Sequence, residues 1–402
     1  MKKSLGWMAV LGSVVFYVVA CAPVNFGVNK SPVSGLTQFC ATTSGGSVCD
    51  YTEDVSGPKV DILFVNDNSA SMSFEQKALA NRFAGFIQML DGKHVDYRIA
   101  MTTTDIHSGQ DDNEPRAING NGSLQNGNLI SFGDGINYLT PAVGDRVSRF
   151  NSAVVRPETL HCEQFIANWV SANGTGTLSS DSYKTQYKAN CPSGDERGTY
   201  AANLAIKNNS GGFLRANAYL AIIFVADEDV RSGLYCGGAN NPNCAATGYP
   251  LEEMDQPLSL FNAFKSQGKD KITEIHAIVV TDNTCLSEQN SQSLGNPAVA
   301  ATNGLVSGSI GKLYLNFPQS GYGVAVSICM NNYTSSLAPI ANKIALNKGA
   351  VIGCDQPINL QVTPIPANPS FSYTRTGKNI VYNTQLPAGS QVRFTYSCPN
   401  QF

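Results

Sequence analysis

Near-continuous hydrophobic runs alternate with amphipathic helical periods over most of the chain. The runs Lys59–Asn66, Tyr219–Val230 and Thr273–Asp282 are typical of strands buried on both faces, because a strand with one exposed face alternates apolar and polar residues. In Ser73–Leu90 the apolar residues instead gather on one side at helical spacing. This alternation predicts an α/β fold in which helices flank a parallel sheet. The other elements predicted there are a strand at Val95–Asp105 and helices at Pro157–Ala172, Thr199–Asn208, Leu258–Ser266 and Thr334–Asn347.

Three segments depart from this alternation. Residues 107–155 are irregular and contain Asn-Gly pairs that mark turns, so we expect a long loop insertion at about 107–198 within an α/β domain spanning 58–350. Near the C-terminus, short alternating segments separated by Pro and Gly predict a small β module at 354–402. Residues 21–57 are rich in Ser, Gly, Thr and Pro without clear periodicity, and we interpret them as a flexible tether.

The N-terminus has the pattern of an export signal. Two lysines precede an apolar run from Leu5 to Ala20, which is long enough for a signal-peptide core but short for a membrane span. Small residues lead directly into Cys21, an arrangement that resembles the bacterial lipobox. We therefore expect residues 1–20 to be a lipoprotein signal peptide and Cys21 to carry lipid, with a plain signal peptide or short membrane anchor as the alternatives. The residues after Cys21, including Pro23, lack the Asp associated with inner-membrane retention, which favours the outer membrane of the cell envelope.

Composition supports export. Charged residues make up only 14% of the chain, and the net charge of −3 gives no general attraction to nucleic acid. With Cys21 set aside for lipid, an even number of the eleven cysteines remains, which indicates disulfides in an exported chain. Zinc is disfavoured because no cysteine pair has CxxC spacing and the histidines are scattered. Neighbours in the chain suggest the pairs Cys40–Cys49, Cys162–Cys191, Cys236–Cys244, Cys285–Cys329 and Cys354–Cys398.

Oxygen-bearing side chains follow two of the predicted strands. Asp67, Ser69 and Ser71 stand at alternate positions directly after the first strand, and Asp227 follows the strongest strand. Thr199 opens a predicted helix. Ligands of an open α/β sheet bind beyond the carboxyl ends of its strands. Carboxylates, hydroxyls and water are the ligands of hard cations, so we expect Mg²⁺ there, with Ca²⁺ or Mn²⁺ as alternatives.

The stretch FVNDNSASM resembles the D-x-S-x-S signature of von Willebrand factor type A domains, which form a metal-ion-dependent adhesion site. Asp67, Ser69 and Ser71 match this signature without departure. Asp227 is the best match to the family's late Asp, and Thr199 matches its Thr by position before a helix. The resemblance implies a Rossmann-like sheet with one antiparallel edge strand, and the five residues as metal ligands.

Several alternatives stay open at individual positions. Thr103, Thr104 or Asp105 could replace Thr199 as a ligand, because Thr199 lies unusually far along the chain from the second strand. A set of simple helix caps would also explain Asp67, Ser69 and Thr199. Glu228 and Asp229 are expected to be solvated loop acids.

The resemblance implies binding rather than catalysis, with the cation coordinating an acidic group of a protein partner. A metal-dependent phosphohydrolase is the enzymatic alternative, but haloacid-dehalogenase chemistry needs a second acid where Ser69 stands. Neither a G-x-S-x-G elbow nor a phosphate-binding loop motif is present in the sequence. A structural envelope lipoprotein with a vestigial metal site is the third hypothesis.

Overall fold

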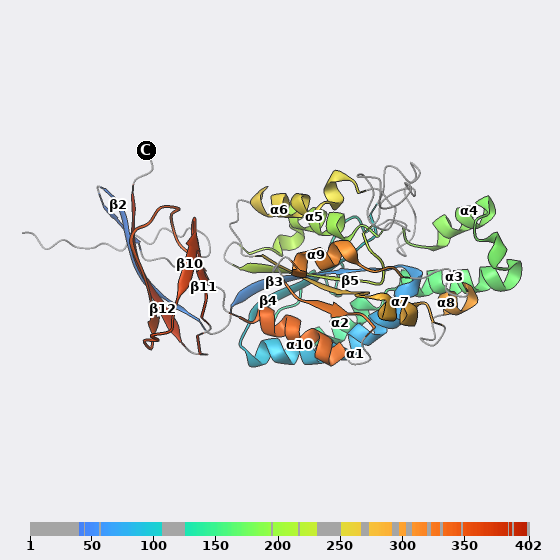
Figure 1. Cartoon of the computed structure of the whole chain (residues 1–402), viewed down its shortest axis with the longest axis horizontal. Helices are drawn as coiled ribbons and strands as arrows, with labels where there is room; N and C mark the ends of the chain where they lie inside the picture. Colours follow the sequence, from blue (N-terminus) through green and yellow to red (C-terminus); the bar gives the residue numbers. More distant parts are fainter. Residues whose placement is uncertain are drawn as a thin grey trace, which may run out of the picture.

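The computed structural model comprises a helix-flanked sheet, a β module and a helical extension formed by α3 (Pro157–Asn173) and α4 (Asp181–Asn190) (Figure 1). In Figure 1 the β module lies at one end of the long axis and the helical extension at the other. The expected signal peptide, Cys21, Cys236 and Cys244 lie outside the described residues. The structure describes residues 40–43, 45–55, 58–106, 125–193, 196–215, 218–230, 251–266, 273–291, 297–302, 308–319, 323–329, 333–346, 349–384, 386–387 and 390–399.

Five strands form the central sheet, in the order β4 (Asp96–Thr103), β3 (Lys59–Asn66), β5 (Tyr219–Ala226), β6 (Thr273–Val279) and β7 (Ala325–Ser327). All neighbouring pairs are parallel. Every residue of β3 after Lys59 is buried, which explains the near-continuous apolar run in the sequence. The predicted α/β class, with a parallel sheet flanked by helices, is therefore confirmed.

Helices cover both faces of this sheet. Alternate residues of β3 point to opposite faces, so Phe64 packs on the aromatic rings of Phe83, Phe86 and Phe150, while Val65 belongs to the core on the other side. One face is covered by α1 (Ser73–Gly92), α2 (Arg146–Val154) and α10 (Tyr333–Ile344), and the other by α5 (Gly198–Asn208), α6 (Pro257–Ser266) and α9 (Lys312–Gln319).

The connections change face between β3 and β5. The chain passes from β3 to β4 through α1 on one face and returns to β5 through α5 on the other, because right-handed connections that run in opposite directions use opposite faces. The carboxyl ends of β3 and β5 therefore border the crevice where such sheets bind ligands. The backbone N–H of Asp67 donates to Val225 O at 2.8 Å, which fixes the loop after β3 at this position.

The outer edge of β4 carries an irregular segment instead of the antiparallel strand that the resemblance implied. Ile99 and Leu139 exchange backbone hydrogen bonds of 2.8 and 2.7 Å in an isolated antiparallel bridge. Residues 133–135 all have positive φ, a conformation that interrupts an extended strand. Within the described ranges, the antiparallel edge is thus reduced to this bridge, and the expected full edge strand is not found there.

Helices, not loops, make up much of the insertion expected at 107–198. The predicted helix is present as α3 (Pro157–Asn173), with Pro157 in its favoured first-turn position. The sequence pattern missed α2 and also α4 (Asp181–Asn190), which packs against α3. Residues 107–124 lie outside the described part of the chain.

The β module includes residues that we interpreted as a tether. One sheet has the order β1 (Cys40–Thr43), β2 (Gly46–Asp54), β12 (Gln391–Pro399), β9 (Ile358–Ile365), and the second has the order β10 (Tyr373–Thr376), β11 (Asn379–Tyr382), β8 (Gly349–Val351). Because β2 pairs with β12 along its whole length, the tether interpretation is wrong for residues 40–54. The module also takes in β8, before the predicted start at residue 354.

Disulfide bonding is confirmed. Among the described residues four bridges are present, and they coincide with four of the neighbouring pairs named above. Cys162–Cys191 connects α3 to the end of α4, and Cys285–Cys329 connects α7 (Asn283–Gln289) to the segment after β7. The other two bridges are Cys40–Cys49 and Cys354–Cys398, both in the β module.

Short elements complete the fold. They are α8 (Pro297–Thr302) and the 3₁₀ helices η1 (Ala70–Met72), η2 (Thr175–Thr177), η3 (Ser210–Gly212) and η4 (Glu253–Asp255).

None of the helices in the described ranges combines the length and apolar character needed to cross a membrane.

Candidate metal centre

The D-x-S-x-S loop forms a compact turn at the carboxyl end of β3. Asp67 Oδ1 accepts a hydrogen bond from Ser69 N at 2.8 Å, and the Ser69 and Ser71 hydroxyl oxygens lie 3.1 Å apart. Asp67 is fully buried, while Ser69 and Ser71 keep 8% and 6% exposure. The three expected ligand residues are therefore together, with the serines nearest to solvent.

The helix-cap alternative does not describe this loop. Ser69 is the N-cap residue of η1 and Met72 that of α1, and neither helix start has a side-chain cap hydrogen bond. The same is true of α5, whose N-cap residue is Arg197. Asp67, Ser69 and Thr199 are thus not explained as helix caps.

Polar contacts from α1 and α3 hold the loop in place. Gln76 Nε2 donates to Asp67 O at 2.9 Å and to Thr159 Oγ1 at 3.0 Å, and the Thr159 hydroxyl donates to Asn68 O at 2.7 Å. Asn68 Nδ2 donates to Glu158 Oε1 at 3.3 Å. Sequence reasoning missed these residues, although Gln76 gave a signal: it is a polar residue on the buried side of an amphipathic helix.

Asp227 lies beside this loop, one residue beyond the end of β5. The register pairs Asn66 with Val225, so the carboxyl ends of β3 and β5 place Asp67 and Asp227 next to each other. Burial raises the pKa of Asp227 well above the usual range, the charge of Asp67 raises it further, and the Ser71 hydroxyl opposes this effect. Neither Asp227 carboxylate oxygen makes a hydrogen bond of normal geometry with a described residue.

The N-terminus of α5 brings Thr199 to the same edge. Arg197 N donates to Thr104 O at 3.1 Å, which ties the helix start to the residue after β4. Thr199 is fully buried, and its hydroxyl finds no hydrogen-bond partner in the part of the chain that the structure describes. The Thr103 hydroxyl has the same character, so Thr103 stays an alternative ligand. Asp105 instead accepts a hydrogen bond from Ser193 N at 3.0 Å, and so holds the chain segment that leads into α5.

The two acids after Asp227 differ from each other. Asp229 is buried, and its Oδ1 accepts hydrogen bonds from Leu313 N at 2.9 Å and Val230 N at 3.0 Å. It therefore anchors the first turn of α9, and the expectation of a solvated loop acid is wrong for Asp229. Glu228 is half-buried, and its charge contributes to the raised pKa of Asp227.

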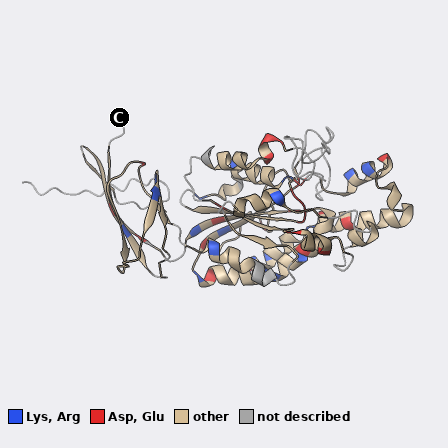
Figure 2. Cartoon of the chain, in the orientation of Figure 1, with Lys and Arg blue, Asp and Glu red and all other residues tan. Residues whose placement is uncertain are grey.

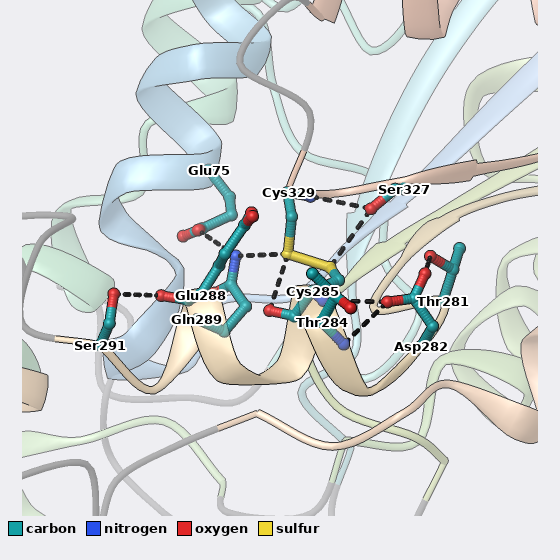
Figure 3. Close-up of a disulfide and its surroundings, with 10 residues drawn as sticks. All are labelled: Glu75, Thr281, Asp282, Thr284, Cys285, Glu288, Gln289, Ser291, Ser327 and Cys329. Carbon is teal, nitrogen blue, oxygen red and sulfur yellow. Dashed lines mark hydrogen bonds between the residues drawn. A yellow bond between two sulfur atoms is a disulfide. The ribbon is translucent and has the colours of Figure 1, made fainter.

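A further carboxyl group, Glu75, lies close to the site in the first turn of α1. Figure 3 shows Gln289 of α7 donating to Glu75 Oε1, at 2.9 Å, beside the Cys285–Cys329 bridge. Burial raises the pKa of Glu75 to about 7, and its charge adds to the effects that raise the pKa of Asp227. The edge between β3 and β5 thus concentrates negative charge in a buried place.

Tyr314 lies on α9, which covers the other face of the sheet from α1, and it reaches the site from that face. Burial raises the pKa of its hydroxyl, and so does the charge of Asp67. A Cβ atom added to Gly198 would lie 2.3 Å from the Tyr314 hydroxyl oxygen, so only glycine fits before Thr199. No sequence signal pointed to Tyr314, because it is an aromatic residue on an apolar helix far along the chain.

The residues present fit a hard divalent cation. Among the described residues, the buried oxygens of Asp227 and Thr199 make no hydrogen bond of normal geometry. Burial and then like charges raise the pKa of Asp227, and a bound cation would oppose this effect. The set contains two carboxylates and three hydroxyls, which suits Mg²⁺ with retained waters. Among the described residues, no group of three or more His, Cys, Asp or Glu side chains is arranged to hold a metal.

Comparison with known proteins assigns neither a family nor a function. No family model matches the sequence, and no curated protein matches it either. One similar solved structure is the pilus adhesin SpaC from Lactobacillus rhamnosus GG, with a TM-score of 0.33 and 12% sequence identity; the match covers 89% of this chain and 42% of SpaC. Another is the pilus adhesin RrgA from Streptococcus pneumoniae, with a TM-score of 0.28 and 10% identity; it covers 88% of this chain and 58% of RrgA. The human COPII-coat protein Sec24c is similar with a TM-score of 0.31 and 8% sequence identity; the match covers 88% of this chain and 42% of Sec24c. The chain spans less than two thirds of each protein.

Proposed function

We propose that this chain is a lipid-anchored binding protein of the bacterial cell envelope. Its von Willebrand factor A-type domain binds a protein partner through a divalent cation. This proposal rests on the buried oxygens of Asp227 and Thr199 beside the Asp67 loop, which make no hydrogen bond of normal geometry with any residue that the structure describes. The proposed ligands, direct or through water, are Asp67, Ser69, Ser71, Thr199 and Asp227.

Binding follows from an incomplete coordination shell. Two carboxylates and three neutral hydroxyls leave room for water on Mg²⁺, which commonly retains several waters in protein sites. A carboxylate of the partner replaces one of these waters and forms a charge-assisted contact. Ser69 and Ser71 are the most exposed members of the set, so the partner approaches on their side. The proposal involves no bond cleavage, and the residues described above include no nucleophile paired with a general base.

A quantitative pull-down tests this function. Envelope extract is passed over the immobilised full-length protein with Mg²⁺, with a chelator, and with Mg²⁺ restored. We expect a specific partner to be retained only with Mg²⁺, and Asp67→Ala to reduce its retention about tenfold or more, because a charge-assisted contact is lost. Asp181→Ala is the matched control, since the Asp181 side chain is fully exposed on α4. Retention that is insensitive to chelator and unchanged in Asp67→Ala would disprove the proposal.

The proposed lipid anchor has a separate test. Cys21 becomes the first residue of the mature protein once residues 1–20 are removed. Mass spectrometry of the membrane fraction should then detect an acylated N-terminal Cys21, and Cys21→Ser should remain unprocessed at that site. A mature chain that starts elsewhere and carries no lipid would contradict the anchor and leave the cation site unaffected.

A further inference from the structure

A hollow of about 390 Å³ lies along the outer half of α3, away from the candidate metal centre. This volume falls within the range of about 300–1,000 Å³ that is usual for small-molecule sites. The lining residues of α3 recur at helical spacing, so they form one continuous stripe on its surface. They are His161, Gln164, Phe165, Asn168, Trp169 and Ala172, with Asn173 at the helix end and Asn190 from α4.

Two aromatic rings form the apolar part of this hollow. Phe165 and Trp169 are half-buried, and their ring centroids are 6.1 Å apart. Both rings rest on the buried ring of Tyr183 from α4, at centroid distances of 6.0 and 5.4 Å. Trp169 Nε1 donates to Thr177 Oγ1 at 2.9 Å, which fixes the orientation of the indole. The rings are therefore held in place before any ligand arrives.

Carboxamides and an imidazole form the polar part. Gln164 Nε2 donates to Asn168 Oδ1 at 2.9 Å, and a hydrogen bond of 3.1 Å joins His161 Nε2 to Asn190 Oδ1. The Cys162–Cys191 disulfide joins the two helices beside the latter contact. Each amide has both donor and acceptor atoms, so the exposed atoms of Gln164 and Asn168 can pair with a group that also does both.

The hollow carries no fixed charge. None of its lining residues is Lys, Arg, Asp or Glu, and the chain from Gln164 to Ser180 contains no charged residue. In Figure 2 the outer half of α3 is correspondingly without blue or red residues. An ionic ligand would find no permanent counter-charge among the lining residues, and a purely apolar one would leave the amides without partners.

We propose that this hollow binds a neutral saccharide. A pyranose ring has an apolar face of C–H groups that can lie on Phe165 or Trp169, and its hydroxyls act as both donors and acceptors toward Gln164 and Asn168. This site is separate from the candidate metal centre and requires no cation. In this arrangement the helical extension binds a glycan, while the sheet edge binds a protein.

The test uses the full-length chain on an array of neutral oligosaccharides ending in glucose, galactose, mannose or N-acetylglucosamine, with sialylated and sulfated glycans for comparison. We expect selective binding of a neutral glycan, and calorimetry with that glycan then measures the variants. Trp169→Ala removes a stacking ring, and the double variant Gln164→Ala/Asn168→Ala removes amides from exposed positions without loss of packing. Each should weaken binding about tenfold or more. Ser171→Ala, an exposed polar residue on the same helix outside the hollow, should bind normally.

Three results would overturn the proposal. The first is an array on which no neutral glycan binds. The second is unchanged affinity in the Gln164→Ala/Asn168→Ala variant, which should fold normally even if Trp169→Ala does not. The third is loss of glycan binding on chelation, which would place the sugar at the cation site instead. Because the expected glycan binding persists in chelator, failure of the proposed metal function would not affect this result.

Discussion

Replacement of Asp227 by Asn is expected to stabilise the metal-free protein and to abolish its stabilisation by Mg²⁺. Asp227 is buried beside Asp67, and its carboxylate oxygens make no normal hydrogen bond with a described residue. An ionised group in this position destabilises the fold by on the order of 1–3 kcal/mol. Asn removes the charge at nearly constant shape, so the metal-free variant should unfold at higher urea concentration than the wild type.

The same substitution should change the pH dependence of stability. The pKa of Asp227 is raised in the folded protein above its ordinary value of 3.8. The protonated carboxyl group of Asp227 therefore contributes its full stabilisation of the fold below pH 3.8, the ordinary pKa. This stabilisation is lost as the pH rises through the raised pKa of the folded protein. The metal-free wild type should lose stability over this pH range, whereas Asp227→Asn should depend less on pH.

Urea unfolding with and without Mg²⁺ measures these effects. Magnesium at about a hundredfold excess over its dissociation constant should stabilise the wild type by about 2.7 kcal/mol and Asp227→Asn by almost nothing. Asp181→Asn makes the same chemical change on a fully exposed side chain, so it should respond to Mg²⁺ like the wild type. An equal Mg²⁺ response in wild type and Asp227→Asn would exclude Asp227 as a ligand.

Replacement of Arg197 by Met is expected to destabilise the domain by about 3–5 kcal/mol. The Arg197 side chain is fully buried and donates to Asp255 from Nε at 3.0 Å and from Nη2 at 2.8 Å. Nη2 also donates to Glu252 at 2.6 Å. Without the guanidinium, the buried carboxylate of Asp255 would keep its charge and lose its cation. Because Arg197 lies two residues before Thr199, the variant should also bind Mg²⁺ more weakly.

Two further variants identify the cause of that loss. Arg197→Met/Asp255→Leu removes both charges and should recover much of the stability, because apolar replacement of a whole buried ion pair is often close to neutral. Arg393→Met breaks an exposed bidentate pair with Asp50 and should destabilise far less than Arg197→Met, because solvent screens an exposed pair. If Arg197→Met were no more destabilising than Arg393→Met, the buried ion pair would not support the start of α5.

The sequence predicts the parts of this fold whose signals are local. β3, β5 and β6 are buried on both faces, so their apolar runs are visible without knowledge of their neighbours. Asp67 and Asp227 could be placed at one sheet edge for the same reason, since each directly follows a recognisable strand. The predicted cation itself stays a prediction.

Elements with non-local partners could not be predicted. The strand β2 has few apolar residues, and its partner β12 lies at the other end of the chain, so no local hairpin pattern reveals it. The helix α4 buries only Tyr183, and therefore lacks an apolar stripe. Asp229 looked like a loop acid because its backbone donors come from α9, which the sequence places far away.

The connection from β2 to β3 gives the molecule a mechanical path. From Cys40 the chain runs through β1 and β2, later enters the central sheet as β3, and reaches the Asp67 loop at the end of that strand. A pull between residue 40 and a partner held at that loop would load β3 lengthwise. Its hydrogen bonds to β4 on one side and β5 on the other would then resist together in shear, rather than opening one after another. Because β3 is paired on both sides along its length, the strand that leads into the proposed ligands is also well supported against force.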